Sequence, residues 1–143
     1  MKFDRTLSYN AEDLAKAFPD VDPGHLPFGS RVLVQLRRPK IRSKGGLILA
    51  EETIETEKWN TQIGKVLAIG PVAFCSRETL KPWPEGAWAK VGDYVRIPKF
   101  NQDKWEVEYE DDGKKELALF MFINDLDLIG KKTGNPLEVK AYV

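Results

Sequence analysis

The sequence predicts an all-β fold, a small irregular β-barrel of short strands, and three observations support this class. Apolar residues alternate with polar residues along several segments, which is the period of a strand with one buried face. Glycine and proline separate these segments, and the body of the chain has no long amphipathic helix pattern. The length of 143 residues fits a single domain with its own core.

Residues 1–26 are expected to form an N-terminal extension with one short helix. Either Ser8 or Asn10 is suited to cap a helix over residues 11–18, and Pro19 ends it. The chain that follows is rich in proline and glycine, which predicts an irregular connector. Because so short a helix is marginal on its own, it either docks on the body or remains mobile.

The first strand of the body is expected just after Phe28. Apolar side chains at every second position from Val32 to Leu36 alternate there with polar side chains between Arg31 and Arg37. This alternation indicates one apolar face and one polar face.

Further strands are expected within residues 63–69, 91–97, 105–110 and 114–123. Gly64 indicates a close backbone approach or a bulge in the first of them. The third alternates apolar residues with glutamates, so its outer face is expected to be acidic. The Asp111-Asp-Gly113 turn predicts that the last two strands form a hairpin.

The longest interruption of the strands covers residues 40–62. It contains an apolar island, Leu47, Ile48 and Leu49, between a pair of glycines and a mostly acidic, polar run. A segment of this length without its own period is usually functional or disordered, and we expect it to be disordered in the free protein. Three consecutive aliphatic residues cannot all face one core, so a partner is expected to bury them.

The second interruption, residues 71–90, is irregular and aromatic. Its aromatic residues Phe74, Trp83 and Trp88 are expected to fold back as a local cluster on the surface.

Composition excludes several classes of function. Lysine plus arginine equals aspartate plus glutamate at 22 each, so the net charge does not indicate a nucleic-acid partner. The N-terminus lacks the apolar core of a signal peptide, and the longest apolar run, residues 117–123, is far shorter than the roughly 20 residues of a membrane span. We therefore expect a soluble, cytoplasmic protein without a membrane partner.

An active site is not expected either. Cys75 and His25 are the only cysteine and histidine, which excludes an internal disulfide and a zinc site built from several such ligands. The sequence has no phosphate-binding glycine loop and none of the common hydrolase or metal-binding motifs. The chain is therefore predicted to be no enzyme and to bind no cofactor or metal.

Five motifs in order resemble GroES-type (group I, ten-kilodalton) co-chaperonins, over roughly residues 27–130. They are Pro27-Phe-Gly-Ser-Arg-Val-Leu-Val-Gln-Leu36, Lys44-Gly-Gly-Leu-Ile-Leu49, Gly64-Lys-Val-Leu-Ala-Ile-Gly70, Val91-Gly-Asp-Tyr-Val95 and Asn124-Asp-Leu-Asp-Leu-Ile129. The chain departs from the family pattern at Phe28 and Ser30, in an aromatic segment where the family has a glycine-rich turn, and in additional residues at both ends, including the tail 131–143. This divergence is similar to that of phage-encoded members.

The resemblance implies a heptameric ring that caps a GroEL-type chaperonin and assists the folding of an encapsulated substrate protein, with ATP used by the chaperonin. A viral capsid protein would be one such substrate, and a phage-encoded chain would act in the host cytoplasm. The mobile loop of the family corresponds to residues 40–62. Its chaperonin-binding residues would be Gly45, Gly46, Leu47, Ile48 and Leu49.

The resemblance also implies a subunit interface and a roof. In the family, the first strand of one subunit pairs with the C-terminal strand of its neighbour, which places residues 31–36 against residues 126–129. The expected interface residues are Arg31, Val32, Val34, Leu126, Leu128 and Ile129, with Val32 and Leu128 as buried contacts. Residues 71–90 correspond to the roof of the dome, with Phe74, Trp83 and Trp88 as its aromatic residues.

A binding module without a chaperonin partner is the alternative. Trp105 beside Lys104, or Tyr94 beside Arg96, has the composition of a base-stacking site on a small barrel that binds nucleic acid or protein. The glutamates that alternate with these aromatic residues disfavour a polyanion. A zinc-dependent dehydrogenase, whose barrel is related, is disfavoured because the chain lacks the cysteine and histidine ligands.

Overall fold

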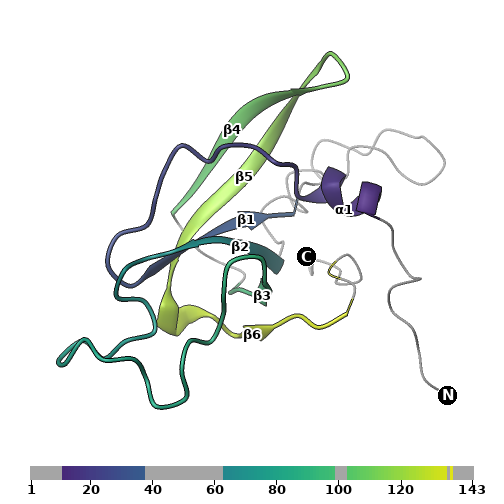
Figure 1. The fold of residues 1–143 in the computed structure, drawn as a ribbon. Helices are drawn as coiled ribbons and strands as arrows, with labels where there is room; N and C mark the ends of the chain where they lie inside the picture. The colour runs from purple at the N-terminus through teal and green to yellow at the C-terminus, as the bar shows by residue number, and fades with distance from the viewer. Residues whose placement is uncertain (1–10, 38–62, 99–102, 135, 137–143) are drawn as a thin grey trace, which may run out of the picture.

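A computed structural model describes residues 11–37, 63–98, 103–134 and 136 of the chain. The elements in chain order are α1 (Ala11–Ala17), β1 (Arg31–Leu36), β2 (Ile63–Ile69), β3 (Tyr94–Arg96), β4 (Lys104–Asp111), β5 (Lys114–Asn124), the 3₁₀ helix η2 (Asp125–Asp127) and β6 (Gly130–Lys131) (Figure 1). The predicted all-β class is confirmed, and so is the short N-terminal helix.

The six strands form one antiparallel sheet in the order β4-β5-β1-β2-β3-β6. Within the described residues the sheet does not close, because β4 and β6 form its two edges. The β4–β5 hairpin and the segment between β2 and β3 extend from opposite ends of the molecule (Figure 1). Strand β1 lies in the middle, with β5 on one side and β2 on the other.

The predicted hairpin between β4 and β5 is confirmed. Its register runs from Asp111 opposite Lys114 to Lys104 opposite Met121. The two turn residues, Asp112 and Gly113, have φ angles of 51° and 77°. Two consecutive residues with positive φ match the right-handed twist of the strands, and Asp-Gly is a favoured pair for that turn.

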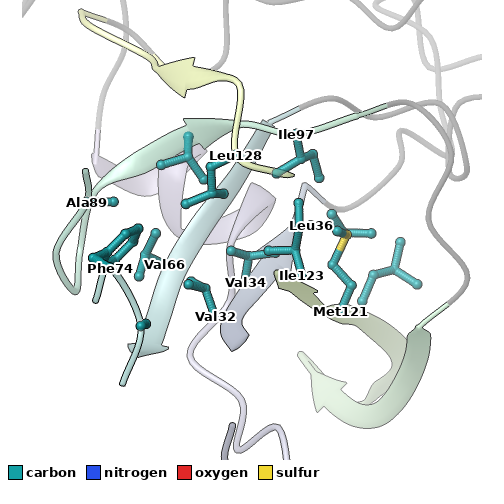
Figure 2. Packing of buried hydrophobic residues seen from close by; sticks show 13 residues of the cluster. Val32, Val34, Leu36, Val66, Phe74, Ala89, Ile97, Met121, Ile123 and Leu128 are labelled. Carbon is teal, nitrogen blue, oxygen red and sulfur yellow. The ribbon is translucent and has the colours of Figure 1, made fainter. Parts of the chain in front are cut away.

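The main core lies on the face of the sheet that the alternation in β1 predicts. Figure 2 shows the side chains of this cluster from β1, β2 and β5, together with Leu128 from the chain after η2 and residues from the segment between β2 and β3. The cluster comprises Val32, Val34, Leu36, Val66, Ala73, Phe74, Ala89, Val95, Ile97, Leu119, Met121, Ile123 and Leu128.

The opposite face of β1 is also buried, although its alternation predicts a polar face. Leu33 is 1% and Gln35 2% exposed, because the chain between α1 and β1 crosses this face. In Figure 1 this connecting segment passes over β5 and β4 before it turns back to β1. The N-terminal extension was expected either to dock on the body or to remain mobile. Its residues between α1 and β1 dock on the sheet.

The glutamates of β4 are exposed and Trp105, Val107 and Tyr109 between them are half-buried, as predicted. Glu106 pairs with Leu119, which belongs to the main core, and Glu108 pairs with Leu117. Directly opposed residues of an antiparallel pair share a face of the sheet. The acidic face is therefore the continuation of the core face beyond the core, and Trp105 and Val107 lie on the opposite face, against the second buried cluster.

Two glycines allow close backbone approaches in the sheet. A Cβ atom on Gly64 would lie 3.1 Å from the Cβ of Val34, which confirms the close approach predicted there. A Cβ atom on Gly70 would lie 2.3 Å from the carbonyl oxygen of Gly29 and 2.8 Å from that of Arg31. The backbone N–H of Gly70 donates a hydrogen bond to Arg31 O at 2.9 Å, so the close backbone contact at Gly70 is part of the hydrogen bonding between the β1 and β2 segments.

Gly70→Ala is expected to destabilise the fold by at least about 2 kcal/mol, because the new methyl group overlaps two backbone carbonyls that cannot move independently. Gly130→Ala is the matched control, since a Cβ atom there meets nothing within 4 Å. Chemical denaturation should show a lower midpoint for Gly70→Ala and a change within about 0.5 kcal/mol for Gly130→Ala. Equal stability of the two variants would contradict the packing described for Gly70.

Candidate functional site

Among the described residues, no group of three or more histidine, cysteine, aspartate or glutamate side chains is placed to hold a metal ion. None of the helices in this part of the chain has the length and hydropathy that a membrane crossing requires. Surfaces with exposed apolar residues are the other candidates for a site.

One buried carboxylate organises the end of the molecule where those surfaces lie. Asp125 is 1% exposed. Its Oδ2 accepts a hydrogen bond from the backbone N–H of Phe74 at 2.8 Å, and its Oδ1 accepts one from the N–H of Leu126 at 2.8 Å. The backbone N–H of Asp125 donates to Ser30 O at 3.1 Å. Three segments distant in sequence therefore meet at this one residue, through its carboxylate and its backbone N–H.

Arg77 compensates the buried charge of Asp125. One guanidinium nitrogen lies 3.6 Å from Oδ1 of Asp125 and also donates a hydrogen bond to the hydroxyl of Ser30. The Arg77 side chain is 53% exposed, so solvent screens much of the charge–charge attraction, and the two backbone hydrogen bonds contribute more. The contact between Ser30 and Arg77 was not identified from the sequence, because the two residues lie 47 positions apart and no local pattern connects them.

The aromatic residues of the segment between β2 and β3 form the local cluster that the sequence predicts. Ring centroids lie 5.6 Å apart for Phe74 and Trp83, 4.7 Å for Trp83 and Trp88, and 6.4 Å for Phe74 and Trp88. Phe74 is buried in the main core with a φ angle of 62°. Its hydrogen bond to Asp125 holds this left-handed conformation, which is unfavourable for a bulky residue.

The tip of the same segment is a tight hydrogen-bonded turn. The Ser76 hydroxyl accepts hydrogen bonds from the backbone N–H groups of Glu78 and Thr79, and the N–H of Leu80 donates to Ser76 O at 2.8 Å. Leu80 has a φ angle of 61° and is 59% exposed. The turn therefore presents an apolar side chain to solvent.

Strand β1 has no free edge within its own subunit. All residues from Val32 to Leu36 are paired with β2 on one side and β5 on the other. Val32 and Val34 are 0% and Leu128 is 7% exposed, within the core of the same chain. Within its own subunit the first strand therefore fills the centre of the sheet, and the expected pairing of residues 31–36 with residues 126–129 of a neighbour stays a prediction for the assembled ring.

The other expected interface residues do lie at the surface. Arg31 is exposed, and Leu126 and Ile129 are 64% and 61% exposed. Two residues that sequence reasoning missed are still more exposed, Leu26 at 77% and Phe28 at 82%. The only signal for them is that Leu-Pro-Phe occurs in a turn-rich connector, where no neighbouring strand period can bury it.

An apolar groove lies beside Ile129. It has a volume of about 320 Å³, and its lining residues are Trp88, Ala89, Val95, Leu128, Ile129, Gly130 and Lys131. Lys131 pairs with Asp93 at 3.4 Å, which keeps its ammonium group at the rim. A groove of this volume is large enough for one aromatic side chain, so the surface near β6 is suited to receive an apolar residue of a partner.

The aromatic residues of the alternative nucleic-acid site are engaged inside the molecule. The Trp105 indole N–H donates to Pro23 O at 3.0 Å, and its ring lies 4.6 Å from that of His25. Tyr94 makes an edge contact with Phe18 at 5.2 Å. Burial also lowers the pKa of the Lys104 ammonium, which disfavours its charged form. These contacts disfavour the base-stacking alternative.

The expected chaperonin-binding residues Gly45, Gly46, Leu47, Ile48 and Leu49 lie outside the described residues, as does most of the tail 131–143. The structure places the two strands that flank them in sequence, β1 and β2, side by side.

Comparison with known families gives one match. The family model described as the chaperonin 10 Kd subunit matches residues 25–131. This range contains all six strands of the sheet. It does not include α1 or the first residues of the segment that connects α1 to β1. A search among curated proteins found no match.

Asp125→Asn is expected to destabilise the fold by about 2–3 kcal/mol. The single amide oxygen retains one of the two backbone hydrogen bonds, while the amide nitrogen meets the other N–H and the attraction to Arg77 is lost. Asp127→Asn, on the exposed side of the same 3₁₀ helix, is expected to change stability by no more than about 0.5 kcal/mol. Denaturant unfolding with equal stability for both variants would show that the buried carboxylate does not hold the three segments together.

Proposed function

The chain belongs to the chaperonin 10 family of co-chaperonins, and we propose that it forms a heptameric lid on a GroEL-type chaperonin. In this role it assists the ATP-dependent folding of an encapsulated substrate protein in the cytoplasm, with ATP used by the chaperonin. The observation that carries the proposal is the family match over residues 25–131, in a chain whose described part is an antiparallel sheet. Because the sequence diverges from the family pattern, we further propose that the protein is encoded by a phage and that its substrate is a viral capsid protein.

We propose that the tripeptide Leu47-Ile48-Leu49 binds the chaperonin, with Gly45 and Gly46 allowing the chain to turn before it. Full burial of three aliphatic side chains contributes roughly 5–8 kcal/mol at about 1.5–3 kcal/mol each. Fixing five loop residues costs a comparable amount at about 1–2 kcal/mol per residue. A single loop should therefore bind weakly, which lets the lid leave when the chaperonin changes state.

A ring converts this weak contact into stable capping. Once one loop has bound, the remaining loops are held near their sites at a high effective concentration, so the overall affinity exceeds that of one loop by orders of magnitude. The proposal therefore requires an assembly interface on each subunit, and the exposed apolar residues of the structure support its location.

We propose that Leu26 and Phe28 of one subunit pack against Leu126 and Ile129 of the next, with an aromatic side chain in the groove beside Ile129. These four residues are 61–82% exposed, which is costly for large apolar side chains unless a partner covers them. The contact joins two different segments of the chain, one before β1 and one after β5. Such a head-to-tail contact closes into a ring when the rotation between subunits permits.

We propose that residues 71–90 form the roof of the dome. Phe74 and Trp83 are more buried than Trp88, which lines the groove of the proposed subunit contact, whereas Leu80 at the tip is 59% exposed and available to an enclosed substrate. Asp125 fixes this segment to the body through Phe74.

Ile48→Asp or Leu47→Asp is expected to abolish capping while the ring remains intact, because a carboxylate cannot enter an apolar groove without a large desolvation cost. Ile54→Asp, in the same segment outside the tripeptide, is the control and should cap normally. The measurement is refolding of a strictly chaperonin-dependent substrate, together with co-sedimentation of the lid with the chaperonin. Normal refolding with the Ile48→Asp variant would rule out the tripeptide as the contact.

Phe28→Asp or Ile129→Asp is expected to convert the ring into monomers with an unchanged fold, because both side chains are exposed in the isolated subunit. Val91→Asp serves as control, since Val91 is equally exposed, at 62%, but lies outside the proposed contact. Sedimentation velocity gives the assembly state and circular dichroism the fold. A ring that survives both substitutions would place the interface elsewhere.

A further inference from the structure

The chain between α1 and β1 crosses the sheet along a single row of directly paired residues. Tyr94 of β3 pairs with Lys65, Lys65 with Gln35, Gln35 with Phe120, and Phe120 with Trp105 of β4. Residues 18–25, here called the strap, contact this row at both ends and in the middle. Most of the strap and all of α1 precede the region that matches the family.

The first contacts of the strap are made with β3 and β1. Phe18 is 4% exposed and makes an edge contact with Tyr94 at a centroid distance of 5.2 Å. The side-chain amide of Gln35 donates a hydrogen bond to Pro19 O at 2.8 Å. Gln35 is itself 2% exposed, so the strap satisfies a polar group that would otherwise be buried without a partner.

The last contacts of the strap are made with β4. The indole N–H of Trp105 donates to Pro23 O at 3.0 Å, and His25 lies against the Trp105 ring. Val21, between the two ends, packs on the buried cluster of Leu33, Ala118 and Phe120. The strap thus binds strands β3, β1 and β4 of the sheet across their direction, rather than extending any one strand.

The strap contacts the sheet close to the ends of strands β1 and β2 that flank the tripeptide in sequence. Gln35 is the residue before Leu36, where β1 ends, and Lys65 is two residues after Ile63, where β2 begins. The strand ends on either side of the segment 38–62 in sequence, at Leu36 and Ile63, therefore lie beside the strap. Trp105 likewise lies one residue after the start of β4.

We propose that the strap is a cross-brace that keeps the strand ends at residues 35–36 and 63–65 closed and thereby sets the strength with which the lid holds its chaperonin. This inference rests on the proposed function of Leu47–Leu49. Strand ends open locally more easily than strand centres. Each opening lengthens the segment that carries the tripeptide and lowers its effective concentration at the chaperonin. Because every subunit of a ring carries one such segment, a small loss of binding free energy in each subunit adds up to a large loss of affinity of the whole ring for the chaperonin.

Two substitutions weaken the brace without removing it. Gln35→Met keeps the length and shape of the side chain but cannot donate to Pro19 O, and Trp105→Phe keeps an aromatic ring but cannot donate to Pro23 O. Ile123→Val is the matched control, because Ile123 pairs with Val32 toward the opposite end of β1 and a lost methylene there reduces stability without touching the strap.

The experiment measures amide hydrogen exchange in the intact ring and the affinity of the ring for the chaperonin. For both brace variants we expect exchange at residues 35–36 and 63–65 to accelerate by about fivefold, which a lost hydrogen bond typically causes, and the affinity to fall by at least that factor. Ile123→Val should leave both unchanged. Unchanged exchange in the brace variants, unchanged affinity, or an equal loss of affinity in Ile123→Val would each overturn the proposal.

Ile48→Asp, measured in parallel, separates this inference from the proposed function. If Ile48→Asp binds the chaperonin as tightly as the parent chain, the tripeptide contact is wrong, and the role of the strap in setting capping strength is overturned with it. If Ile48→Asp fails to bind while the brace variants bind normally, the tripeptide contact stands and the inference alone is wrong.

Discussion

Strand β1 is paired along both edges and buried on both faces, and the rest of the described chain is arranged around it. One face packs on the main core with Val66, Met121 and Leu128, and the other is covered by the strap. Every residue of this strand from Val32 to Leu36 is paired on both sides within the subunit. The proposed ring contact therefore uses exposed side chains such as Phe28 and Ile129.

The carboxylate of Asp125 fixes where those side chains lie. It connects the turn before β1, the aromatic segment between β2 and β3, and the 3₁₀ helix after β5, so the apolar residues of all three segments hold fixed positions relative to one another. The strap performs a comparable task at the other end of β1, where Gln35 and Trp105 donate side-chain hydrogen bonds to its backbone. In the proposed function, the two ends of this strand would serve two different contacts, one with a neighbouring subunit and one with the chaperonin.

Much of the fold follows from local patterns in the sequence. The core-facing side of β1, the Asp-Gly turn between β4 and β5, and the close approach at Gly64 each depend on neighbouring residues, and the structure confirms them. The burial of Gln35 and the engagement of Trp105 were not predictable, because they depend on a strap that comes from a distant part of the sequence. The exposure of Leu26 and Phe28 was missed for the same reason, since no local period distinguishes an exposed leucine from a buried one. The tripeptide at residues 47–49 was identified from sequence alone and lies outside the described residues.

The most direct test of the co-chaperonin function is native mass spectrometry of the purified full-length chain, alone and mixed with a GroEL-type chaperonin and ATP. A ring of seven subunits that adds as one unit to the chaperonin is the result that the proposed lid requires. A monomer that adds no mass to the chaperonin in the presence of ATP would contradict both the ring and its partner.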